Sequence, residues 1–571
     1  MNRLVPVLTL LFIAILALVF WDEGGDDLVF SKEERIRIRA LKPYIASGTS
    51  LARASKSSEE KDSAVIKAEP PDVGIANPAA ADSTSFIKGV LSANLPSEGE
   101  SVAALPIARW DVVPFQSFSG SFCAGVVAFH KEGMEAVHFK VGERTLAVKA
   151  LTRNPRTGIP EYWLRLDAEA HPEGELSLAA RAVAKDGSYR DLPPLTLFVR
   201  RDSGTTGRRI CVSTSGEDSA AGSPEAPLKT LARALSLAKG GDEVVLLDAG
   251  RYGDSLVGPV QKKFSVDRWI TLRPREGLPE GAALIAPSVR STLRFGPDKI
   301  RFIGLSFDFH TIAELYHRPE GMFWFDRCRW FDSAGPLSIY KPQLIPVRTI
   351  EEIRASYATD CLARDMLYGF VHQTLVRGCR VENITGDAFQ NSRMVLYSTL
   401  DGMDGALLPH HSDVLQYFGH FENVIVFGLR GHNISSTQNF FLDHKDSSFR
   451  DMAFVNILLE NLTPSPPHSQ LASSARHLLF RHITNPSQTW VFRDDMPGAK
   501  KFRACDVLFS NCVLDNLLRG SREARLPPGV ISSACHFVKG PALGVLPTSG
   551  ALDLLPAGGG FSFSGPAAQL L

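Results

Sequence analysis

Three segments, TLVRGCRVEN (374–383), MAFVNILLEN (452–461) and VLFSNCVLDN (507–516), share one pattern of apolar and turn-forming residues. Their third positions are Val376, Phe454 and Phe509, their fifth are Gly378, Asn456 and Asn511, and their sixth are Cys379, Ile457 and Cys512. Weaker copies begin at Ile300, Met394, Val424 and Leu478, and successive starts from 394 onward lie 30, 28, 26 and 29 residues apart. The chain therefore repeats a strand-and-turn unit at a nearly constant period.

Strand units that cannot close a core alone indicate a solenoid, in which each coil covers the next. The apolar positions are expected to point inward and to stack at about 4.8 Å per coil. The recurrent glycine and asparagine are expected at corners that need left-handed or sharply turned backbone. We therefore interpret Asn383, Asn461 and Asn516 as structural residues. The sequence predicts an all-β protein whose residues 208–571 form a parallel β-helix.

The segment that precedes the repeats, ICVSTSGEDSAAGSPEAPLKTLARALSLAKGGDEVVLLDAGRY (210–252), predicts a strand, a polar loop, a helix and a buried strand. The helix should open near Pro227, bury Leu228, Leu231, Leu235 and Ala238, and end at Gly240-Gly241. This arrangement resembles the entry to right-handed parallel β-helix proteins of the pectate-lyase-like superfamily, where such a helix covers the open end of the stack. A cap is needed because the first coil would otherwise expose unpaired backbone.

Residues 106–203 carry short alternating runs such as VVAFH, EYWLRLDA and LTLFVRR, separated by turn signals. This pattern predicts a β-sandwich that resembles bacterial Ig-like modules, because no Cys…Trp…Cys framework is present. We expect a spacer or docking module without chemistry of its own.

The first 29 residues contain an uncharged run, Leu4 to Phe20, between Arg3 and an acidic segment. This predicts a transmembrane signal anchor that places the bulk of the protein in the periplasm or outside the cell, or a secreted protein if the signal is cleaved. Residues 30–105, rich in Ser, Ala, Glu, Lys and Pro, predict a disordered linker. The expected location is the cell envelope.

Charge and cysteine content exclude some functions. Lys+Arg and Asp+Glu both count 62, so no broad basic surface for nucleic acid is expected. The eight cysteines show no metal-finger spacing and are interpreted as buried apolar residues. The sequence leaves the oligomeric state open.

One polar cluster interrupts the repeats. PHHSDVLQYFG (409–419) follows GDAFQNSR (386–393) and precedes SSTQNFFLDHK (435–445), and Asp387-x-x-Gln390 matches Asp413-x-x-Gln416. Gln390, Gln416 and Gln438 are therefore expected to stack about 5 Å apart. Either they form a hydrogen-bonded ladder within the stack, or the cluster lines a polysaccharide groove. For the groove, the predicted substrate-binding residues are Gln390, Gln416, Gln438, His410, Asn391 and Asn439, and the predicted catalytic residues are His411, Asp413, Asp387, Lys445 and Arg393.

The resemblance implies cleavage or epimerisation of an acidic, uronate-containing polysaccharide. Proton removal beside a carboxylate needs a base and a neutralising charge, for which we assign His411 and a cation or strong donors. The superfamily implies Ca²⁺, with Asp387, Asp413 and Asp443 as candidate ligands. The family's multi-aspartate calcium constellation is not recognisable here. The expected activity is that of a lyase or epimerase, and hydrolysis and non-catalytic carbohydrate binding at the cell surface remain alternatives.

Overall fold

The computed structural model of the protein describes residues 104–201, 207–258, 264–316, 321–336, 355–407, 412–442, 447–461, 469–471, 474–492, 504–519, 526 and 529–537. The predicted membrane anchor (1–29) and almost all of the predicted linker lie outside these residues. Within the described ranges, no helix has the length and apolarity that crossing a bilayer requires.

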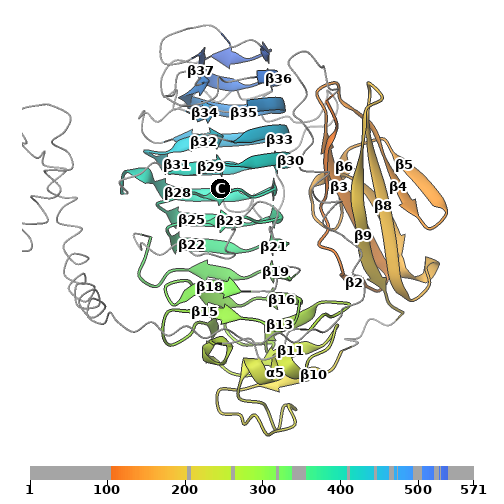
Figure 1. The fold of residues 1–571 in the computed structure, drawn as a ribbon, viewed down its shortest axis with the longest axis vertical. Helices are drawn as coiled ribbons and strands as arrows, with labels where there is room; N and C mark the ends of the chain where they lie inside the picture. Colours follow the sequence, from red (N-terminus) through yellow and green to blue (C-terminus); the bar gives the residue numbers. More distant parts are fainter. Residues whose placement is uncertain are drawn as a thin grey trace, which may run out of the picture. The chain divides into compact units, whose positions relative to one another are not determined.

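Residues 107–199 form two β-sheets that pack face to face (Figure 1). One has the order β1 (Ile107–Trp110), β3 (Ser121–Phe129), β7 (Pro160–Asp167) and β6 (Thr152–Arg153). The other has the order β2 (Ser117–Phe118), β9 (Tyr189–Val199), β8 (Gly174–Ala184), β4 (Met134–Val141) and β5 (Arg144–Val148), and η2 (Ala168–Ala170) links β7 to β8. Apolar side chains from both sheets, including Val126 and Phe139, fill the space between them. This is the predicted β-sandwich; its likeness to Ig-like modules stays a prediction.

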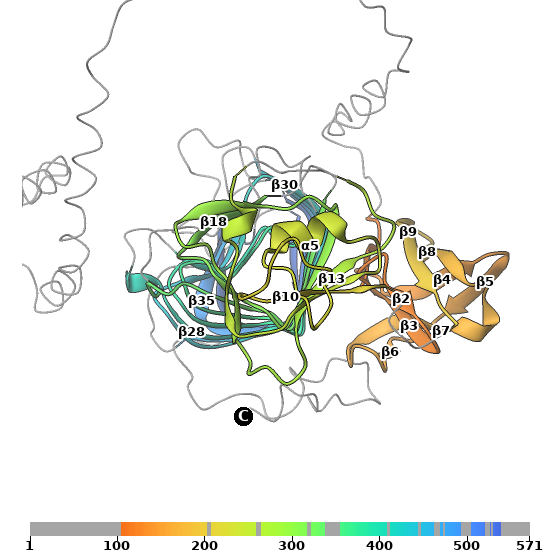
Figure 2. The same cartoon turned by 90° about the horizontal axis from the view of Figure 1, so that it is seen from below.

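Of the remaining described strands, 28 form one parallel sheet that coils as a β-helix, as the repeats predicted. Seen along the stack, strands of successive coils superpose, and α5 (Leu231–Leu237) lies at the first coils (Figure 2). Thr230 caps α5 by accepting the backbone N–H of Arg233 at 3.2 Å. The helix begins later than predicted because Asp218 holds the backbone N–H groups of Lys229 and Thr230 in the preceding loop.

We name the three stacks of strands faces A, B and C. Face A comprises β10 (Arg209–Val212), β11 (Glu243–Leu246), β13 (Ile270–Pro274), β16 (Lys299–Ile303), β19 (Met322–Asp326), β21 (Ser356–Thr359), β24 (Leu375–Arg377), β27 (Met394–Leu396), β30 (His420–Phe427), the first parts of β33 (Ser448–Asn461) and β35 (Ser474–Phe492), β36 (Ala504–Ser510) and β38 (Val530–Ser533).

Face B comprises β12 (Gly250–Tyr252), β14 (Ala283–Ile285), β17 (Ser306–Asp308), β20 (Arg329–Phe331), β22 (Leu362–Met366), β25 (Arg380–Ile384), β28 (Thr399–Asp404), β31 (Arg430–Ser435), later parts of β33 and β35, the first part of β37 (Val513–Arg519) and β39 (His536–Phe537). Face C comprises β23 (Phe370–Val371), β26 (Phe389–Gln390), β29 (Asp413–Tyr417), β32 (Gln438–Leu442), β34 (Ser469–Leu471) and the ends of β35 and β37. β15 (Ser291–Arg294) and β18 (Ile312–Tyr316) form a separate parallel pair, and η3 (Asp254–Leu256) and η5 (Gly405–Leu407) are single turns.

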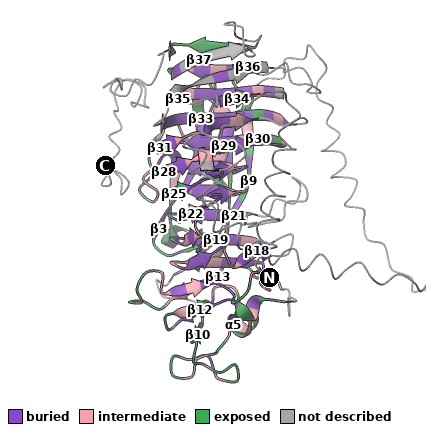
Figure 3. Cartoon of the chain, turned by 90° about the vertical axis from the view of Figure 1, so that its left-hand side faces the viewer, coloured by how far each residue is buried: buried purple, intermediate pink, exposed green. Residues whose placement is uncertain are grey.

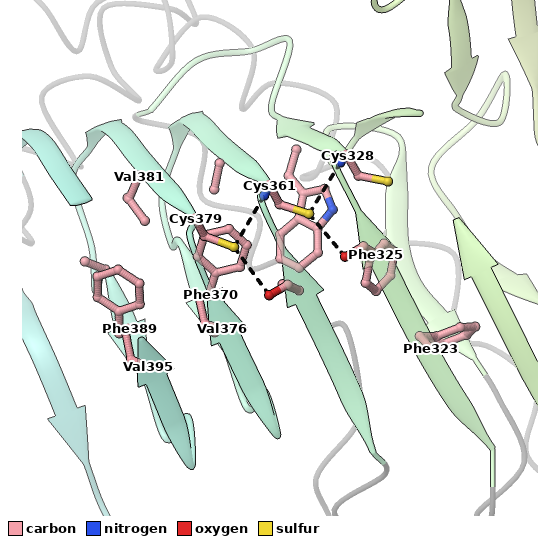
Figure 4. Close-up of a cluster of buried hydrophobic side chains, with 14 of the residues drawn as sticks. Phe323, Phe325, Cys328, Cys361, Phe370, Val376, Cys379, Val381, Phe389 and Val395 are labelled. Carbon is pink, nitrogen blue, oxygen red and sulfur yellow. Dashed lines mark hydrogen bonds between the residues drawn. The ribbon is translucent and has the colours of Figure 1, made fainter. Parts of the chain in front are cut away.

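The interior of the β-helix is a continuous apolar column, and buried residues occur along the strands of successive coils (Figure 3). Phe454, Phe480 and Phe509, on three successive coils, stack with ring centroids 4.9 and 4.5 Å apart. Cys328, Cys361 and Cys379 are buried in the same interior, as predicted, and Figure 4 shows them on neighbouring coils. The repeats were therefore correctly assigned to the core.

Four of the predicted corner residues adopt left-handed backbone. Gly378, Asn456 and Asn511 have φ of 63°, 55° and 52°, and Asn383 has φ of 50°. One register prediction was wrong: Met394 pairs with Ile425, not with Val424. Since side chains alternate across a strand, this shift of one residue in register turns the Met394 side chain outward.

The β-sandwich packs against the outer side of face A. Ile107, Val127 and Phe129 of the sandwich form one apolar cluster with outward side chains such as Trp324, Met394 and Phe427. Outward-facing Trp324 is therefore buried, and so are its inward-facing neighbours Phe323 and Phe325. The part of face A that carries this cluster is thus covered on both sides by protein.

A column of residues with left-handed backbone lies within this contact. Asn423, Asp451, His477 and Asp506, which we call the left-handed column, have φ between 52° and 57° on four successive coils. Asn423 exchanges two hydrogen bonds of 2.9 Å with the backbone of Ala108. Asp451 and Asp506 pair with Arg190 and Lys131 of the sandwich at 2.5 and 2.6 Å. These polar contacts fix the register of the sandwich along the β-helix.

Candidate functional site

The predicted polar cluster lies on face C. Gln390 in β26 pairs with Gln416 in β29, which confirms that these two stack on neighbouring coils. The Gln390 side-chain amide donates to the Oδ2 of Asp387 at 2.6 Å and to the Oε1 of Gln416. Gln416 in turn donates to the Oδ2 of Asp413 at 2.7 Å. The two D-x-[FL]-Q motifs therefore form one hydrogen-bonded network, which we call the amide ladder (Asp387, Gln390, Asp413, Gln416).

The third glutamine does not continue this stack. Gln438 pairs with Asp413, and Gln416 pairs with Phe441. The prediction that Gln438 follows Gln416 was wrong, because the inward pairing of Leu415 with Phe440 sets the register of β32. Gln438 and Asn439 are buried, and the Asn439 amide donates to the Oδ1 of Asn485 at 2.8 Å.

Three of the four residues of the amide ladder have little contact with solvent. Asp413 is fully buried, Asp387 is 4% exposed and Gln416 is 9% exposed, whereas Gln390 is partly exposed. Asn391, also buried, has a φ of 51° and accepts the backbone N–H of Phe418 at 3.0 Å. The described members of the predicted site therefore have the arrangement of the structural ladder rather than that of an open groove.

Other members of the predicted site are placed elsewhere or are not described. Arg393 lies at the start of β27 on face A, with its guanidinium 5.8 Å from the ring centroid of Phe421. Burial lowers its pKa, and the charge of Glu422 opposes that shift. His410, His411, Asp443 and Lys445 lie outside the described residues. The catalytic roles assigned to them stay predictions.

The described carboxylates of the ladder do not fit a calcium site as they are arranged. Ca²⁺ takes six to eight oxygen ligands, whereas Asp387 and Asp413 face the N–H groups of glutamine amides and of the Asp413 backbone. Among the residues that the structure describes, no group of three or more His, Cys, Asp or Glu side chains is arranged to hold a metal ion. The calcium prediction now depends on Asp443.

A second polar site, which the sequence did not predict, lies on the outer side of face B. Arg364, Glu382, Asp401 and His432 pair in register on four successive strands, β22, β25, β28 and β31. Glu460 in β33 follows on the next coil and accepts a hydrogen bond from His432. We call these five residues the ionic row. All five side chains are half-buried or exposed, because they take the outward position of each strand.

The best-defined pair in the row is His432 with Glu460. The Nδ1 of His432 lies 2.6 Å from the Oε2 of Glu460, and the two side chains are 28% and 39% exposed. A carboxylate accepts only from an N–H, so Glu460 fixes the tautomer of a neutral imidazole with its lone pair on Nε2. An imidazole held in this way can accept a proton from a molecule in solution.

Cationic and anionic groups flank this pair. Arg430 precedes His432 by two positions and therefore lies on the same side of β31. Burial lowers the pKa of Arg430, and the charge of Glu460 opposes that shift. Asp401, exposed on the preceding coil, accepts a hydrogen bond of 2.6 Å from the Asn433 amide. A base, a guanidinium and a carboxylate thus lie on the outward side of two neighbouring strands of face B.

The position before the recurrent asparagines was the sequence signal for the ionic row. Glu382, His432 and Glu460 each directly precede a recurrent corner residue, Asn383, Asn433 or Asn461. The alignment of repeats drew attention to the asparagines and to the interior positions. The outward position before each asparagine carries the titratable groups.

Comparisons with known proteins add one local match. Residues 214–258, which run from the loop before α5 to the strand pair after it, match a family described as "Protein of unknown function (DUF1565)". No curated protein matches the chain. A solved structure described as "The complex structure of XylC with xylose" is 10% identical, with a TM-score of 0.21, over 55% of this chain and 69% of that one. A similarity this low places no constraint on the function of the present protein.

Proposed function

We propose that the protein binds an extended acidic polysaccharide along the ionic row and removes a proton from one uronate unit, as a lyase or an epimerase does. The observation that carries this proposal is the partly exposed His432–Glu460 pair, with Arg430 on the same strand and Asp401 on the preceding coil. Residues of the row repeat at about 4.8 Å, the spacing of strands in a sheet. That repeat suits the sugar units of an extended chain lying parallel to the stack.

Each group has a chemical role in proton removal. The proton beside a uronate carboxylate is weakly acidic, so the carboxylate needs a neutralising partner while a base takes the proton. Arg430 can pair with a carboxylate through two parallel N–H groups. His432 can take the proton on Nε2 and become an imidazolium that Glu460 stabilises. Asp401 can bind the sugar hydroxyls that orient the ring.

Hydrolysis is a second candidate, favoured by one observation. Glu382 and Asp401 pair in register on neighbouring strands, so two carboxyl groups stand one coil apart on the exposed side of face B. Glycosidases use two carboxyl groups, about 5–5.5 Å apart in retaining enzymes. In this case Glu382 and Asp401, rather than His432, would be required for turnover.

The amide ladder then has a structural role. Buried amide–carboxylate hydrogen bonds fix the register of face C, whereas the ionic row can contact a polymer without any rearrangement of the coils.

The proposed location of the protein is the cell envelope. The anchor assigned to residues 1–29 would present the ionic row outside the cytoplasm. Fractionation of cells that produce the full chain would test that location.

The decisive experiment is turnover of defined polysaccharides. Purified protein is incubated with a panel of uronate polymers, with and without Ca²⁺, and elimination is followed by the near-ultraviolet absorbance of unsaturated products. Epimerisation is followed by exchange of the sugar C5 proton with deuterated solvent. His432→Ala should lower turnover by about 10²–10⁴-fold, the usual contribution of a general base. Glu460→Gln should lower it less, because the imidazole remains.

The matched control is His420→Ala. His420 is an exposed histidine of face A that is also held by one neighbour, with its Nδ1 2.7 Å from the Oγ of Ser448. Its loss should leave turnover unchanged. New reducing ends without unsaturation, abolished by Asp401→Asn, would replace elimination with hydrolysis. If the protein bound a polymer but formed no product, its function would be carbohydrate binding without catalysis. If it bound none of the polymers, the proposal would be refuted.

A further inference from the structure

Two cysteines stack on the last coils that the structure describes. Ser510 pairs with Ser533 before them and Val513 pairs with His536 after them, so Cys512 and Cys535 occupy equivalent positions. The turns that carry them are alike: Asn511 and Ala534 both have a φ of 52°. Each thiol also lies near the carbonyl two residues before it, at 3.3 Å from Ser510 O and 3.5 Å from Ser533 O. The two side chains therefore point in the same direction, one above the other.

This spacing is compatible with a covalent bond between the two sulfur atoms. Residues in register on neighbouring parallel strands lie about 4.8 Å apart. The Cα atoms of a disulfide are usually separated by about 4.4–6.8 Å. A rotation of the two thiols toward each other would suffice, without a change in the register of the coils.

Access to solvent distinguishes this pair from the other stacked cysteines. Cys328, Cys361 and Cys379 also lie on neighbouring coils (Figure 4). The Cys361 sulfur accepts the backbone N–H of Cys328, and the Cys379 sulfur accepts that of Cys361, each at 3.4 Å. All three are buried. Cys512 is buried as well, but Cys535 is partly exposed, and it is the one such thiol among the cysteines whose side chains the structure describes.

We propose that Cys512 and Cys535 form an oxidisable dithiol that closes the last described coils with a disulfide when a small-molecule disulfide is present. This modification is independent of the ionic row and of any carbohydrate chemistry. It would join β36 and β37 to β38 and β39 by a covalent bond, in addition to the backbone pairing that now connects them.

The reaction balances as two thiol–disulfide exchanges. The accessible Cys535 thiolate attacks a sulfur of the reagent, forms a mixed disulfide and releases one thiolate. Cys512 then loses its proton to solvent and attacks the Cys535 sulfur, which releases the second thiolate. Two protein thiols are oxidised and one disulfide is reduced. The hydrogen bond with Cys535 and burial raise the pKa of Cys512, so the second exchange should be the slower one and should accelerate with rising pH.

The test uses the full chain and oxidised glutathione. After incubation, free thiols are blocked, and mass spectrometry of peptides from the unreduced protein identifies the crosslinked cysteines. The expected product is a Cys512–Cys535 disulfide, with Cys328, Cys361 and Cys379 reduced. Hydrogen exchange should then be about 10²-fold slower in Ala504–Ser510 and Val530–Ser533, because the crosslink restricts local opening.

Serine variants supply the controls. Ser398 follows Cys379 in the stack and accepts the Cys379 backbone N–H at 3.3 Å, so the chain itself tolerates serine in such a position. Cys512→Ser and Cys535→Ser should each abolish the crosslink and the slower exchange, and Cys379→Ser should preserve both. A stable glutathione adduct on Cys535 without closure would overturn the proposal. Unreacted Cys535, or crosslinks among the buried cysteines, would overturn it equally.

Discussion

Arg377 of the β-helix donates a hydrogen bond of 2.7 Å to the carboxylate of Asp111 in the β-sandwich, across 266 residues of sequence. The Asp111 side chain is fully buried and that of Arg377 is 12% exposed. A charge in such a place needs its partner, because either group alone would be buried without compensation. The sandwich is thus packed into the folded unit, as a docking module would be, and a docking module is one of the two roles that its sequence left open.

Removal of Arg377 should destabilise the whole unit. Arg377→Leu leaves the Asp111 carboxylate buried without its ion pair, and we expect a loss of about 3–5 kcal/mol in the free energy of unfolding. Chemical denaturation followed by tryptophan fluorescence measures the loss. Arg181→Leu is the control, since its pair with Asp191 is exposed and its removal should change little. The double variant Asp111→Asn/Arg377→Leu should recover part of the stability. Equal effects of Arg377→Leu and Arg181→Leu would contradict the role of the buried pair.

Stability should also depend on pH through Glu161, a buried residue of β7. Burial, and next the charge of Asp111, raise the pKa of Glu161 well above 4.5. The folded protein therefore keeps a proton that the unfolded chain releases. The stabilisation by the neutral carboxyl is complete below about pH 4.5 and declines as the pH rises toward the folded pKa. Glu161→Gln should flatten this decline when unfolding is measured between pH 5 and pH 8. Glu175→Gln, at an exposed position of β8, should retain the wild-type slope.

Asn423 should contribute to stability in two separable ways. Its side chain exchanges two hydrogen bonds with Ala108, and its φ of 57° is tolerated by glycine and asparagine better than by alanine. Asn423→Gly removes only the hydrogen bonds, and we expect a loss of about 1–3 kcal/mol. Asn423→Ala should cost about 1 kcal/mol more, because it adds backbone strain. Thermal unfolding of both variants measures the difference. If alanine were tolerated as well as glycine, the left-handed backbone would not be a constraint at this position.

The interior and corner positions of the fold could be predicted because similar residues recur at them in successive coils. Interior positions such as Val376, Phe454 and Phe509 recur with apolar residues, and the corners recur with asparagine or glycine. Register was less predictable, because a shift of one residue, as at Met394, preserves composition and reverses the face. Packing of the sandwich on face A joins residues far apart in sequence, such as Ala108 and Asn423. The continuous apolar run of β30, Val424 to Phe427, was the available signal that both sides of face A are covered.

The candidate site was harder to predict for a physical reason. A sequence shows which residues are polar but not which polar groups satisfy one another. Asp387 and Asp413 were conspicuous because their motif recurs, and the same recurrence lets their glutamines bond within the stack. The ionic row has five positions with four residue types, so the asparagine that follows Glu382, His432 and Glu460 is its one recurrent mark in the sequence. A search for recurrent motifs in the sequence thus finds the buried amide ladder more readily than the ionic row.

The two sites can be separated by matched substitutions of carboxylates, one buried and one exposed. Asp413→Asn places two N–H donors where a fully buried carboxylate now accepts from Gln416, so we expect a loss of about 1–3 kcal/mol in stability. Turnover per folded molecule should be unchanged. Asp401→Asn, on the exposed row, should leave stability nearly unchanged and lower polymer binding or turnover. Denaturation and product formation are measured on the same preparations. The reverse outcome, with activity lost in a stable Asp413→Asn variant, would return the active site to face C and to the histidines at 410 and 411.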